Sequence, residues 1–326
     1  MNRDGLPSRT SLALLVSAVL VAWTAPTTAQ ALRYEAIGSL PGPYEAMRVE
    51  GRHAYVAAGR TLTIYDLSTP TAPKRLGSHT FAEQVWSFRV VESTAWVGVN
   101  FSGLAILDVS NGAAPVLRGF FKTPGQAKAA AVVGTKALVV DHMEGLVMVD
   151  VANPAKPVGL GSFFVDGYAR DVVASGKHVY GVDSPTGLYV FDFSKPGPPE
   201  PVLTLQTGNN LRSVEVSDSA HLLVAVGGGT LQPYDIANPA APVQLPAYRT
   251  PGGAQRVALR GTLAYVADGR EGLQVVDLAN ASAPRIVASF KTDRVARDVA
   301  VGDGVVLVAQ GGPKDKQDVV VLRQTP

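Results

Sequence analysis

The sequence contains no cysteine, few aromatic residues and few charges. Without thiols the chain has neither disulfides nor a lipid-modified N-terminal Cys. Only 17% of the residues are charged, and 29 Lys+Arg against 27 Asp+Glu leave a formal charge of +2. This near balance provides no overall field that would attract nucleic acid or an anionic membrane, so we expect no nucleic-acid partner. A hydrophobic fraction of 46% excludes a disordered chain.

Long hydrophobic runs are also missing. The longest, from Leu12 to Trp23, follows two arginines and is shorter than the roughly 20 residues that span a bilayer. Ala29-Gln30-Ala31 then supplies a small-x-small cleavage site, so residues 1–31 are predicted to be a secretory signal peptide, with an uncleaved anchor as the alternative. We expect the mature chain, 32–326, to lie in the periplasm, at the cell surface or in the medium, without stable membrane insertion.

A repeat of 42 residues runs through the mature chain. A five-residue apolar segment that ends in Asp recurs six times, and the Asp-to-Asp steps are 42, 42, 42, 43 and 42. The copies are LTIYD (Leu62–Asp66), LAILD (Leu104–Asp108), LVMVD (Leu146–Asp150), LYVFD (Leu188–Asp192), LQPYD (Leu231–Asp235) and LQVVD (Leu273–Asp277), with a degenerate seventh copy, DVVVL, at Asp318–Leu322. Residues 32–326 therefore hold close to seven repeats and no additional domain.

Each repeat contains about four short runs rich in Val, Leu, Ala and Tyr, separated by Gly, Pro, Asn or Ser. Seven such units predict an all-β, seven-bladed β-propeller of four-stranded antiparallel blades rather than a solenoid, whose ends need atypical capping repeats. The last repeat is one strand short, and Ile37-Gly38-Ser39 near the start resembles outer-strand segments such as Leu76-Gly77-Ser78. We therefore predict that the N-terminal strand completes the last blade and removes the open edge.

The Asp that closes each apolar segment is followed by a turn rich in Asn, Gly and Pro. Six recurrences favour a structural role over metal or acid chemistry, because Asp accepts backbone N–H groups ahead of it in turns. Pro233 interrupts the third strand of blade five and cannot donate a ladder hydrogen bond, so a bulge or local defect is expected there.

The segments LVMVD, LAILD and LQVVD, with the turn that follows and the 42-residue spacing, resemble the LVIVD repeat family of secreted or cell-surface propellers in bacteria and archaea. The resemblance covers nearly all of the mature chain. It implies a β-propeller outside the cytoplasm, in a family mostly without assigned activity. It supplies no catalytic residues.

The innermost strand of each propeller blade lines the central channel, and one position at its upper end should face the channel mouth. This position holds Glu45, Trp86, Lys128, Arg170, Arg212, Gln255 and Arg297. Four of these seven residues are basic, and converging cations can hold an anion. The alternative is that they pair with neighbouring acids, since Asp171 and Asp298 directly follow two of the arginines. Trp86 either stacks on a ligand or packs between blades.

Loops on the same face contain Asp141, Asp183 and Asp268 at equivalent positions. They could form a charge ring or hold a hard cation such as Ca²⁺, but an Asp before a hairpin turn is the simpler interpretation. If the protein has a catalytic site, His142 and Glu144 with an arginine at the mouth would be the acid, base and anion clamp.

The usual catalytic and cofactor motifs are absent: the sequence has no G-x-S-x-G elbow and no P-loop. With five scattered histidines and no cysteine, neither a metal centre nor a cofactor is expected. The leading interpretation is an exported binding module that presents its loop face to a protein, a glycan or a small anionic ligand. The alternatives are a lactonase-like periplasmic hydrolase that uses the mouth charges and a purely structural surface protein.

Overall fold

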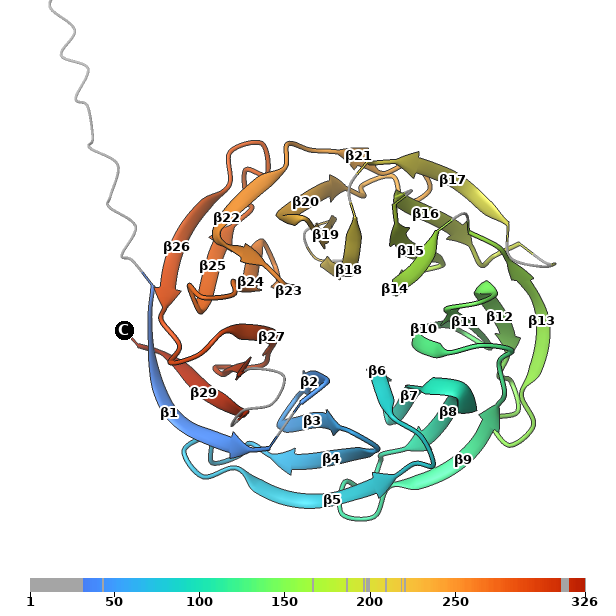
Figure 1. Cartoon of the computed structure of the whole chain (residues 1–326), viewed down its shortest axis with the longest axis horizontal. Helices are drawn as coiled ribbons and strands as arrows, with labels where there is room; N and C mark the ends of the chain where they lie inside the picture. Colours follow the sequence, from blue (N-terminus) through green and yellow to red (C-terminus); the bar gives the residue numbers. More distant parts are fainter. Residues whose placement is uncertain are drawn as a thin grey trace, which may run out of the picture. The chain divides into compact units, whose positions relative to one another are not determined.

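Seven antiparallel β-sheets surround a central channel in the computed structural model (Figure 1). The structure describes residues 32–42, 44–165, 167–185, 187–195, 197, 200–208, 210–217, 219, 221–311 and 317–325, so the predicted signal peptide lies outside the described residues. Six sheets have four strands and one has five, as expected for a seven-bladed propeller. Among the described residues, no helix is long and apolar enough to cross a bilayer.

Blades 1 to 4 each run from an inner to an outer strand. Blade 1 comprises β2 (Ala46–Glu50), β3 (His53–Ala58), β4 (Thr61–Asp66) and β5 (Lys74–Thr80). Blade 2 comprises β6 (Val85–Val91), β7 (Thr94–Val99), the 3₁₀ turn η1 (Asn100–Ser102), β8 (Gly103–Asp108) and β9 (Val116–Phe121). Blade 3 comprises β10 (Ala127–Val133), β11 (Lys136–Asp141), β12 (Gly145–Asp150) and β13 (Val158–Phe163). Blade 4 comprises β14 (Tyr168–Ser175), β15 (His178–Ser184), β16 (Gly187–Asp192) and β17 (Pro201–Gln206).

Blades 5 to 7 depart from this pattern in one place and close the ring. Blade 5 comprises β18 (Leu211–Ser217), β19 (Leu222–Gly227), β20 (Gly229–Asp235), β21 (Val243–Gln244) and β22 (Tyr248–Ala254). Blade 6 comprises β23 (Arg256–Arg260), β24 (Leu263–Ala267), β25 (Leu273–Asp277) and β26 (Arg285–Phe290). Blade 7 comprises β27 (Ala296–Val301), β28 (Val306–Gln310), β29 (Asp318–Thr325) and, from the other end of the chain, β1 (Arg33–Pro41).

The ring closes as the sequence predicts. Strand β1 pairs antiparallel with β29, from Arg33 opposite Thr325 to Pro41 opposite Asp318, and becomes the outer strand of blade 7 (Figure 1). The first and last described strands are thus hydrogen-bonded in one sheet, and the edge of β29 is covered by β1.

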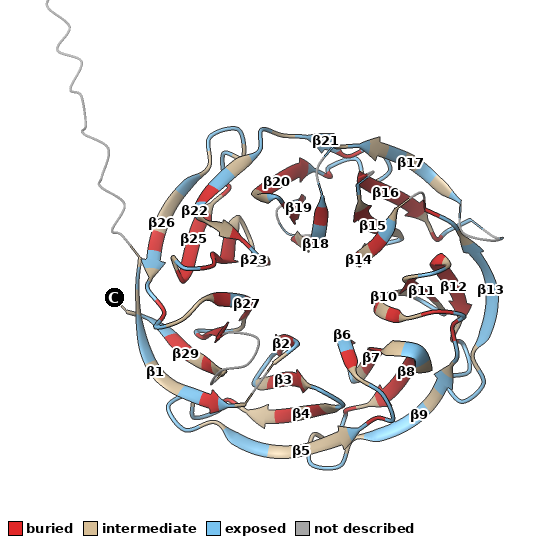
Figure 2. Ribbon diagram, viewed as in Figure 1, coloured by how far each residue is buried: buried red, intermediate tan, exposed pale blue. Residues whose placement is uncertain are grey.

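The hydrophobic core is divided into seven clusters, one at each boundary between neighbouring blades. Side chains alternate along each inner strand. Successive apolar residues, such as Val172 and Val173, pack toward opposite neighbouring blades, while charged residues such as Arg89 and Glu215 line the channel. The blade-facing residues Phe88, Val172 and Val257 are buried. Burial is concentrated in the inner and middle strands, whereas outer strands such as β5, β9 and β13 carry most of the exposed positions (Figure 2).

Glycines in the outer strands let neighbouring blades approach closely. A Cβ on Gly119 in β9 would lie 1.8 Å from the carbonyl oxygen of Pro154, in the turn of blade 3. A Cβ on Gly77 in β5 would lie 2.6 Å from the carbonyl oxygen of Ala113, in the turn of blade 2. The recurring outer-strand glycine therefore makes room for the turn of the next blade.

All six recurring Asp residues form the expected turns. In each, Oδ1 accepts a hydrogen bond from the backbone N–H two residues ahead, and the N···O distances are 2.8 to 2.9 Å. The six residues are Asp66, Asp108, Asp150, Asp192, Asp235 and Asp277. The Ser110 hydroxyl and the Arg118 guanidinium lower the pKa of Asp108 to about 2. The structural interpretation of these acids is confirmed.

Pro233 disturbs the outer part of blade 5 rather than the strand that contains it. β20 pairs with β19 in continuous register through Pro233 opposite Val224. On its other side the partner is divided into the two-residue β21 and the longer β22, and a register shift falls between Gly229 and Thr230. The predicted defect is therefore present, in the outer ladder of this blade.

Candidate functional site

A pocket of about 280 Å³ opens at one end of the channel. Four of the predicted mouth residues line it, together with three residues that lie slightly deeper. The lining comprises Trp86, Ser87, Lys128, Arg170, Asp171, Arg212 and Arg256. These side chains come from the inner strands of blades 2 to 6, so the pocket exists only because the ring brings these strands together. We call it the mouth pocket.

The mouth residues project from irregularities in the inner strands. In five blades the pairing with the second strand skips one residue, and the skipped residue is the predicted mouth position. These residues are Trp86, Lys128, Arg170, Arg212 and Arg297. A bulge redirects the side chain of the extra residue. A β-bulge in the inner strand therefore places each of these five side chains at the mouth.

Three cations of the mouth pocket lack an acidic partner. Among the described residues, no carboxylate lies within 4.0 Å of the charged nitrogens of Lys128, Arg170 or Arg212. The Nε atom of Arg170 is buried and has no hydrogen-bond partner there either. The alternative that Asp171 neutralises Arg170 is not realised, because Asp171 faces the channel and pairs with other arginines.

Aromatic side chains and cations alternate along one side of the mouth. The Trp86 indole N–H donates to Asn100 Oδ1 at 3.1 Å, and Lys128 Nζ lies 5.6 Å from the centre of the Trp86 ring. Lys128 Nζ also lies 3.2 Å from His142 Nδ1. The His142 ring stacks on Tyr168 with 4.9 Å between centroids, and the Arg170 guanidinium carbon lies 5.6 Å from the Tyr168 centroid. Trp86 is therefore an exposed mouth residue and is not packed between blades.

The surrounding cations shift the titration of this cluster. Burial, followed by the nearby Lys128 and Arg170 charges, lowers the pKa of His142 below its ordinary value. His142 is consequently neutral near pH 7, and its Nδ1 can accept a hydrogen bond from the Lys128 ammonium. Burial and the Arg170 charge also lower the pKa of Lys128.

The remaining predicted residues do not line the mouth pocket. Arg297 Nε donates to the Gly311 carbonyl at 2.6 Å, and Gln255 Nε2 donates to the Gly253 carbonyl at 2.9 Å. Glu45 bonds through its backbone N–H to Ala57. Among the described residues, the Glu144 carboxylate makes no ion pair or hydrogen bond with His142, so the postulated acid–base pair is not assembled.

The three equivalent loop aspartates are buried and hydrogen-bonded. Asp141 accepts the N–H groups of Met143 and Glu144 in its own turn and of Gly125 in the preceding connection. Asp183 accepts from the Gly187 N–H and the Tyr189 hydroxyl, whereas Asp268 accepts from the Gly252 N–H and the Thr250 hydroxyl of β22 in the neighbouring blade. The turn interpretation therefore holds for Asp141 and Asp183, while Asp268 links two blades. No group of three or more potential metal-binding side chains occurs in the described part of the chain.

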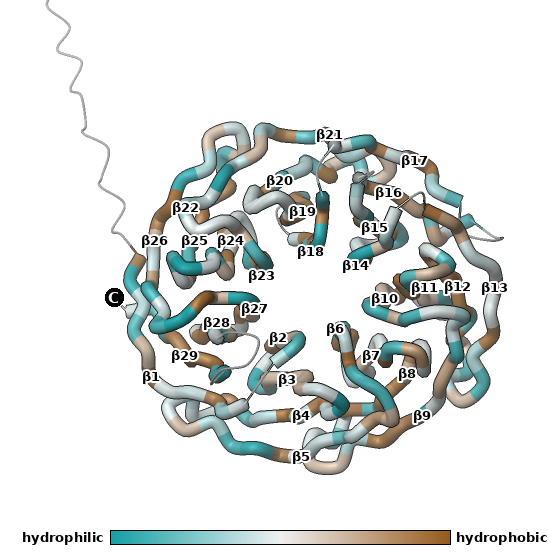
Figure 3. The backbone as a smooth tube through the Cα atoms, viewed as in Figure 1, coloured by the Kyte–Doolittle hydropathy of each residue, from teal (hydrophilic) through white to brown (hydrophobic). Residues whose placement is uncertain are grey.

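Sequence reasoning missed a network of six charged side chains inside the channel. We call this network the charge belt: Arg48, Arg89, Asp171, Glu215, Arg256 and Asp298. Its members come from the inner strands of six blades, and their side chains are 2 to 20% exposed. Hydrophilic positions recur on inner strands such as β14, β18 and β23 (Figure 3). The sequence does carry a signal for these residues. Each lies one or three positions after a mouth position, on the side of the strand that the two-residue alternation turns toward the channel.

Glu215 is the central acceptor of the charge belt. Arg89 Nη1 donates to both of its carboxylate oxygens, at 2.8 and 2.7 Å, and Arg48 Nη2 lies 3.2 Å from one of them. Burial alone would lower the pKa of Arg89, but Glu215 and Asp171 overcome this effect and the net shift is upward. Burial and the neighbouring Arg89 charge lower the pKa of Arg48.

A second layer of pairs lies nearer the mouth. Arg256 Nη1 lies 3.4 Å from Asp171, and its Nε lies 3.6 Å from Asp298. Asp298 also accepts the backbone N–H groups of Met47 and Val299. Asp171, Glu215 and Asp298 are thus held by arginines across the channel and are not available to the mouth cations.

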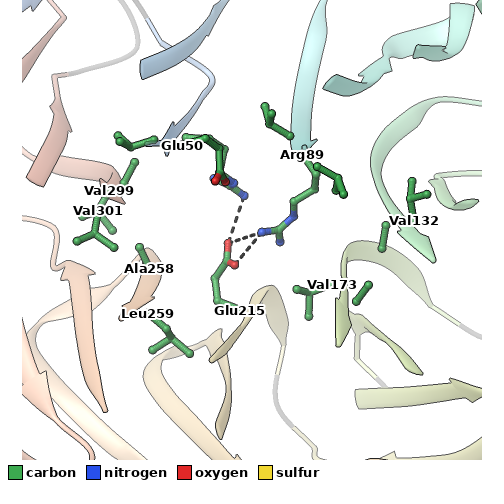
Figure 4. A pocket seen from close by; sticks show the side chains of 16 residues that line it. Glu50, Arg89, Val132, Val173, Glu215, Ala258, Leu259, Val299 and Val301 are labelled. Atoms are coloured by element: carbon green, nitrogen blue, oxygen red, sulfur yellow. Dashed lines mark hydrogen bonds and ion pairs between the residues drawn. The ribbon is translucent and has the colours of Figure 1, made fainter. Parts of the chain in front are cut away.

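A further pocket, of about 240 Å³, lies on the other side of the charge belt. Arg48, Arg89 and Glu215 contribute to it, and its walls are mostly Val, Ala and Leu from the inner strands. Figure 4 shows Arg89 and Glu215 pointing toward one another across this pocket, surrounded by Val132, Val173 and Leu259. Both of its arginines are paired with Glu215, whereas Lys128, Arg170 and Arg212 of the mouth pocket have no carboxylate partner among the described residues.

Replacement of Glu215 by Gln should destabilise the fold strongly. The change leaves two buried arginines without their shared anion, a loss worth about 3–5 kcal/mol of unfolding free energy. Urea denaturation of the variant measures this loss. Arg285→Ala is the control, because it removes an exposed partner of Asp277 and should cost less than about 1 kcal/mol. Equal losses in the two variants would contradict the role of the belt.

The comparisons with known proteins agree with this architecture. The family model described as the LVIVD repeat matches residues 42–80, 84–123, 124–164, 166–207 and 251–292. These segments correspond to blades 1 to 4 and blade 6. No curated protein matches the chain.

Among solved structures, the β-propeller domain of Cps50 (Swd1) from Myceliophteria thermophila is similar, with a TM-score of 0.73 at 11% sequence identity. The alignment covers 90% of this chain and 100% of that one. At this level of identity the likeness concerns the fold alone.

Proposed function

The chain belongs to the LVIVD repeat family, and from this premise we propose that it is an exported binding module whose mouth pocket takes an anionic group of its partner. The observation that carries the proposal is the convergence of Lys128, Arg170 and Arg212 on one pocket without a carboxylate partner among the described residues. Three like charges in a small concave space repel one another, and a bound carboxylate, phosphate or sulfate would relieve this repulsion.

The scaffold favours recognition without large ordering costs. Each cation is carried by a short inner strand, and the strands are held by the closed ring and by the belt beneath them. A site whose groups are already in place loses little conformational entropy on binding. Arginine adds directional donors suited to carboxylate and phosphate, and Lys128 adds a point charge. The proposed activity is binding rather than turnover.

The double variant Arg170→Ala/Arg212→Ala tests the site. For the mature chain we expect citrate, inorganic phosphate or sulfate to raise the melting temperature, because a ligand that binds only the native state stabilises it by mass action. The double variant should lose this increase while its own melting temperature stays nearly unchanged, since neither arginine has an acidic partner among the described residues whose loss would cost stability. Differential scanning fluorimetry measures both quantities.

Arg297→Ala is the matched control, because Arg297 occupies the same bulge position in blade 7 but lies outside the mouth pocket. It should retain the response to anions. The proposal fails if no anion stabilises the mature chain, or if the double variant responds as the wild type does.

His142 should make anion binding dependent on pH. Its pKa is lowered by burial and by the two neighbouring cations, and an anion at the mouth would offset the cations and raise that pKa. Binding is then coupled to proton uptake, so affinity should increase as the pH falls below the ordinary pKa of His, about 6.5.

Isothermal titration with citrate at several pH values measures this dependence, with sulfate as a probe whose own charge stays constant. His142→Gln should flatten the profile for sulfate, whereas citrate should keep the part of its pH dependence that comes from its own protonation. An unchanged profile in the variant would show that another group is responsible.

Export is supported by the N-terminal pattern of two arginines, the apolar run and Ala29-Gln30-Ala31. N-terminal sequencing of the exported protein from a bacterial host should give Leu32 as the first residue. Replacing Ala29 and Ala31 by Leu should block this processing. Recovery of the wild-type chain at full length from the cytoplasm would contradict export.

A further inference from the structure

Five large apolar side chains are exposed on the loop face around the mouth. They are Trp86 (37% exposed), Phe101 (51%), Met143 (64%), Phe164 (69%) and Tyr168 (53%). Phe101 lies in η1, Met143 in the turn between β11 and β12, and Phe164 between β13 and β14. Connections of these two kinds open on the same end of the blades, so all five belong to the mouth face of blades 2 to 4. We call this set the apolar crescent.

The other exposed large apolar residues lie elsewhere. Most belong to outer strands, as Val116, Val158 and Val243 do, and Val91 lies at the end of β6 away from the mouth. Apolar residues scattered singly over a surface are normal, but a contiguous group beside a pocket marks an interaction site. The crescent gathers on one face of three successive blades, and Trp86 is also part of the lining of the mouth pocket.

Cations are interleaved with the crescent. Lys122 Nζ donates to the carbonyl of Phe101 at 3.1 Å, Lys128 lies over Trp86, and Arg170 lies over Tyr168. Among the described residues, Lys122 has no ion pair with a carboxylate. Among the described residues, Glu83 and Glu144 are the acids in these connections that are not buried, against the three cations. The described part of this surface therefore alternates apolar area with an excess of positive charge.

We propose that the apolar crescent and the mouth pocket together bind a segment of a partner protein in which acidic and apolar residues alternate. The acidic side chain would occupy the pocket, and the apolar side chains would cover Phe101, Met143 and Phe164. This proposal rests on the proposed function and names the partner class of the same site. Aromatic, Met and Arg residues are enriched where protein interfaces derive most of their affinity.

The positions of the rings favour a peptide over a glycan. Sugars bind by stacking on free aromatic faces, but His142 and Arg170 lie against Tyr168, and Lys128 lies over Trp86. The most exposed members are Phe164 and Met143, whose side chains suit contact with apolar side chains of a peptide. The alternating pattern also requires a ligand with both charged and apolar groups.

The test uses an immobilised array of short random-sequence peptides and the labelled mature chain. Two variants are compared with the wild type. The crescent variant is Phe101→Ser/Met143→Ser/Phe164→Ser, and the matched control is Val116→Ser/Val158→Ser/Val243→Ser, which removes apolar side chains of similar exposure from the outer strands. Citrate titration and melting temperature are measured on every protein.

We expect the peptides that bind the wild type to be enriched in Asp or Glu next to Leu, Phe or Met. The crescent variant should bind them at least about tenfold more weakly, as loss of interface anchors does. The control variant should bind normally, and both should still respond to citrate. Arg170→Ala should weaken binding of both peptide and citrate.

The outcomes separate this inference from the proposed function. If citrate binds but the array gives no acidic and apolar enrichment, or the crescent variant retains peptide binding, the partner assignment is overturned and anion recognition stands. If neither citrate nor any peptide binds, the proposed function itself fails. Vesicles containing anionic phosphatidylglycerol are the final comparison: capture by these vesicles that is lost in the crescent variant, without peptide binding, would assign the surface to a membrane and overturn the proposal.

Discussion

The pairing of β1 with β29 is the interaction on which the rest of the structure depends. It joins strands from opposite ends of the chain, from Arg33 opposite Thr325 to Pro41 opposite Asp318, and it completes blade 7. Each blade buries its two faces only against its neighbours, so an open ring would expose two faces and an unpaired edge. Closure also forms the mouth pocket, because the side chains that line it come from separate blades and meet only in the ring (Figure 1).

The charge belt explains why the mouth keeps unpaired cations. Each inner strand alternates its side chains, so Asp171 faces the channel and is held by Arg89 and Arg256. The adjacent Arg170 is redirected by a bulge to the mouth and has no acid within reach among the described residues. Acids are thus used to neutralise arginines inside the channel, where an unpaired charge is costly, and the surplus of positive charge remains at the mouth, where water or a ligand can solvate it.

Much of this architecture follows from local sequence patterns. The spacing of the closing Asp residues predicts the number of blades, and the resemblance of Ile37-Gly38-Ser39 to other outer strands predicts closure. The mouth positions of Trp86, Lys128, Arg170 and Arg212 are also predictable. The Arg89–Glu215 pair is not, because its members lie 126 residues apart and meet only across the finished ring. The unmatched repeats have physical causes: blade 5 has a divided outer strand opposite Pro233, and blade 7 is assembled from both ends of the chain.

The central claim is that a closed ring holds Lys128, Arg170 and Arg212 ready for an anionic group. The most direct test is a crystal structure of the mature chain, residues 32–326, soaked with selenate, whose selenium atom is located by anomalous scattering. The selenium peak should lie inside the mouth pocket, with oxygen atoms within hydrogen-bonding distance of these three side chains. An empty mouth pocket in crystals that bind selenate elsewhere, or carboxylates paired with the three cations, would contradict it.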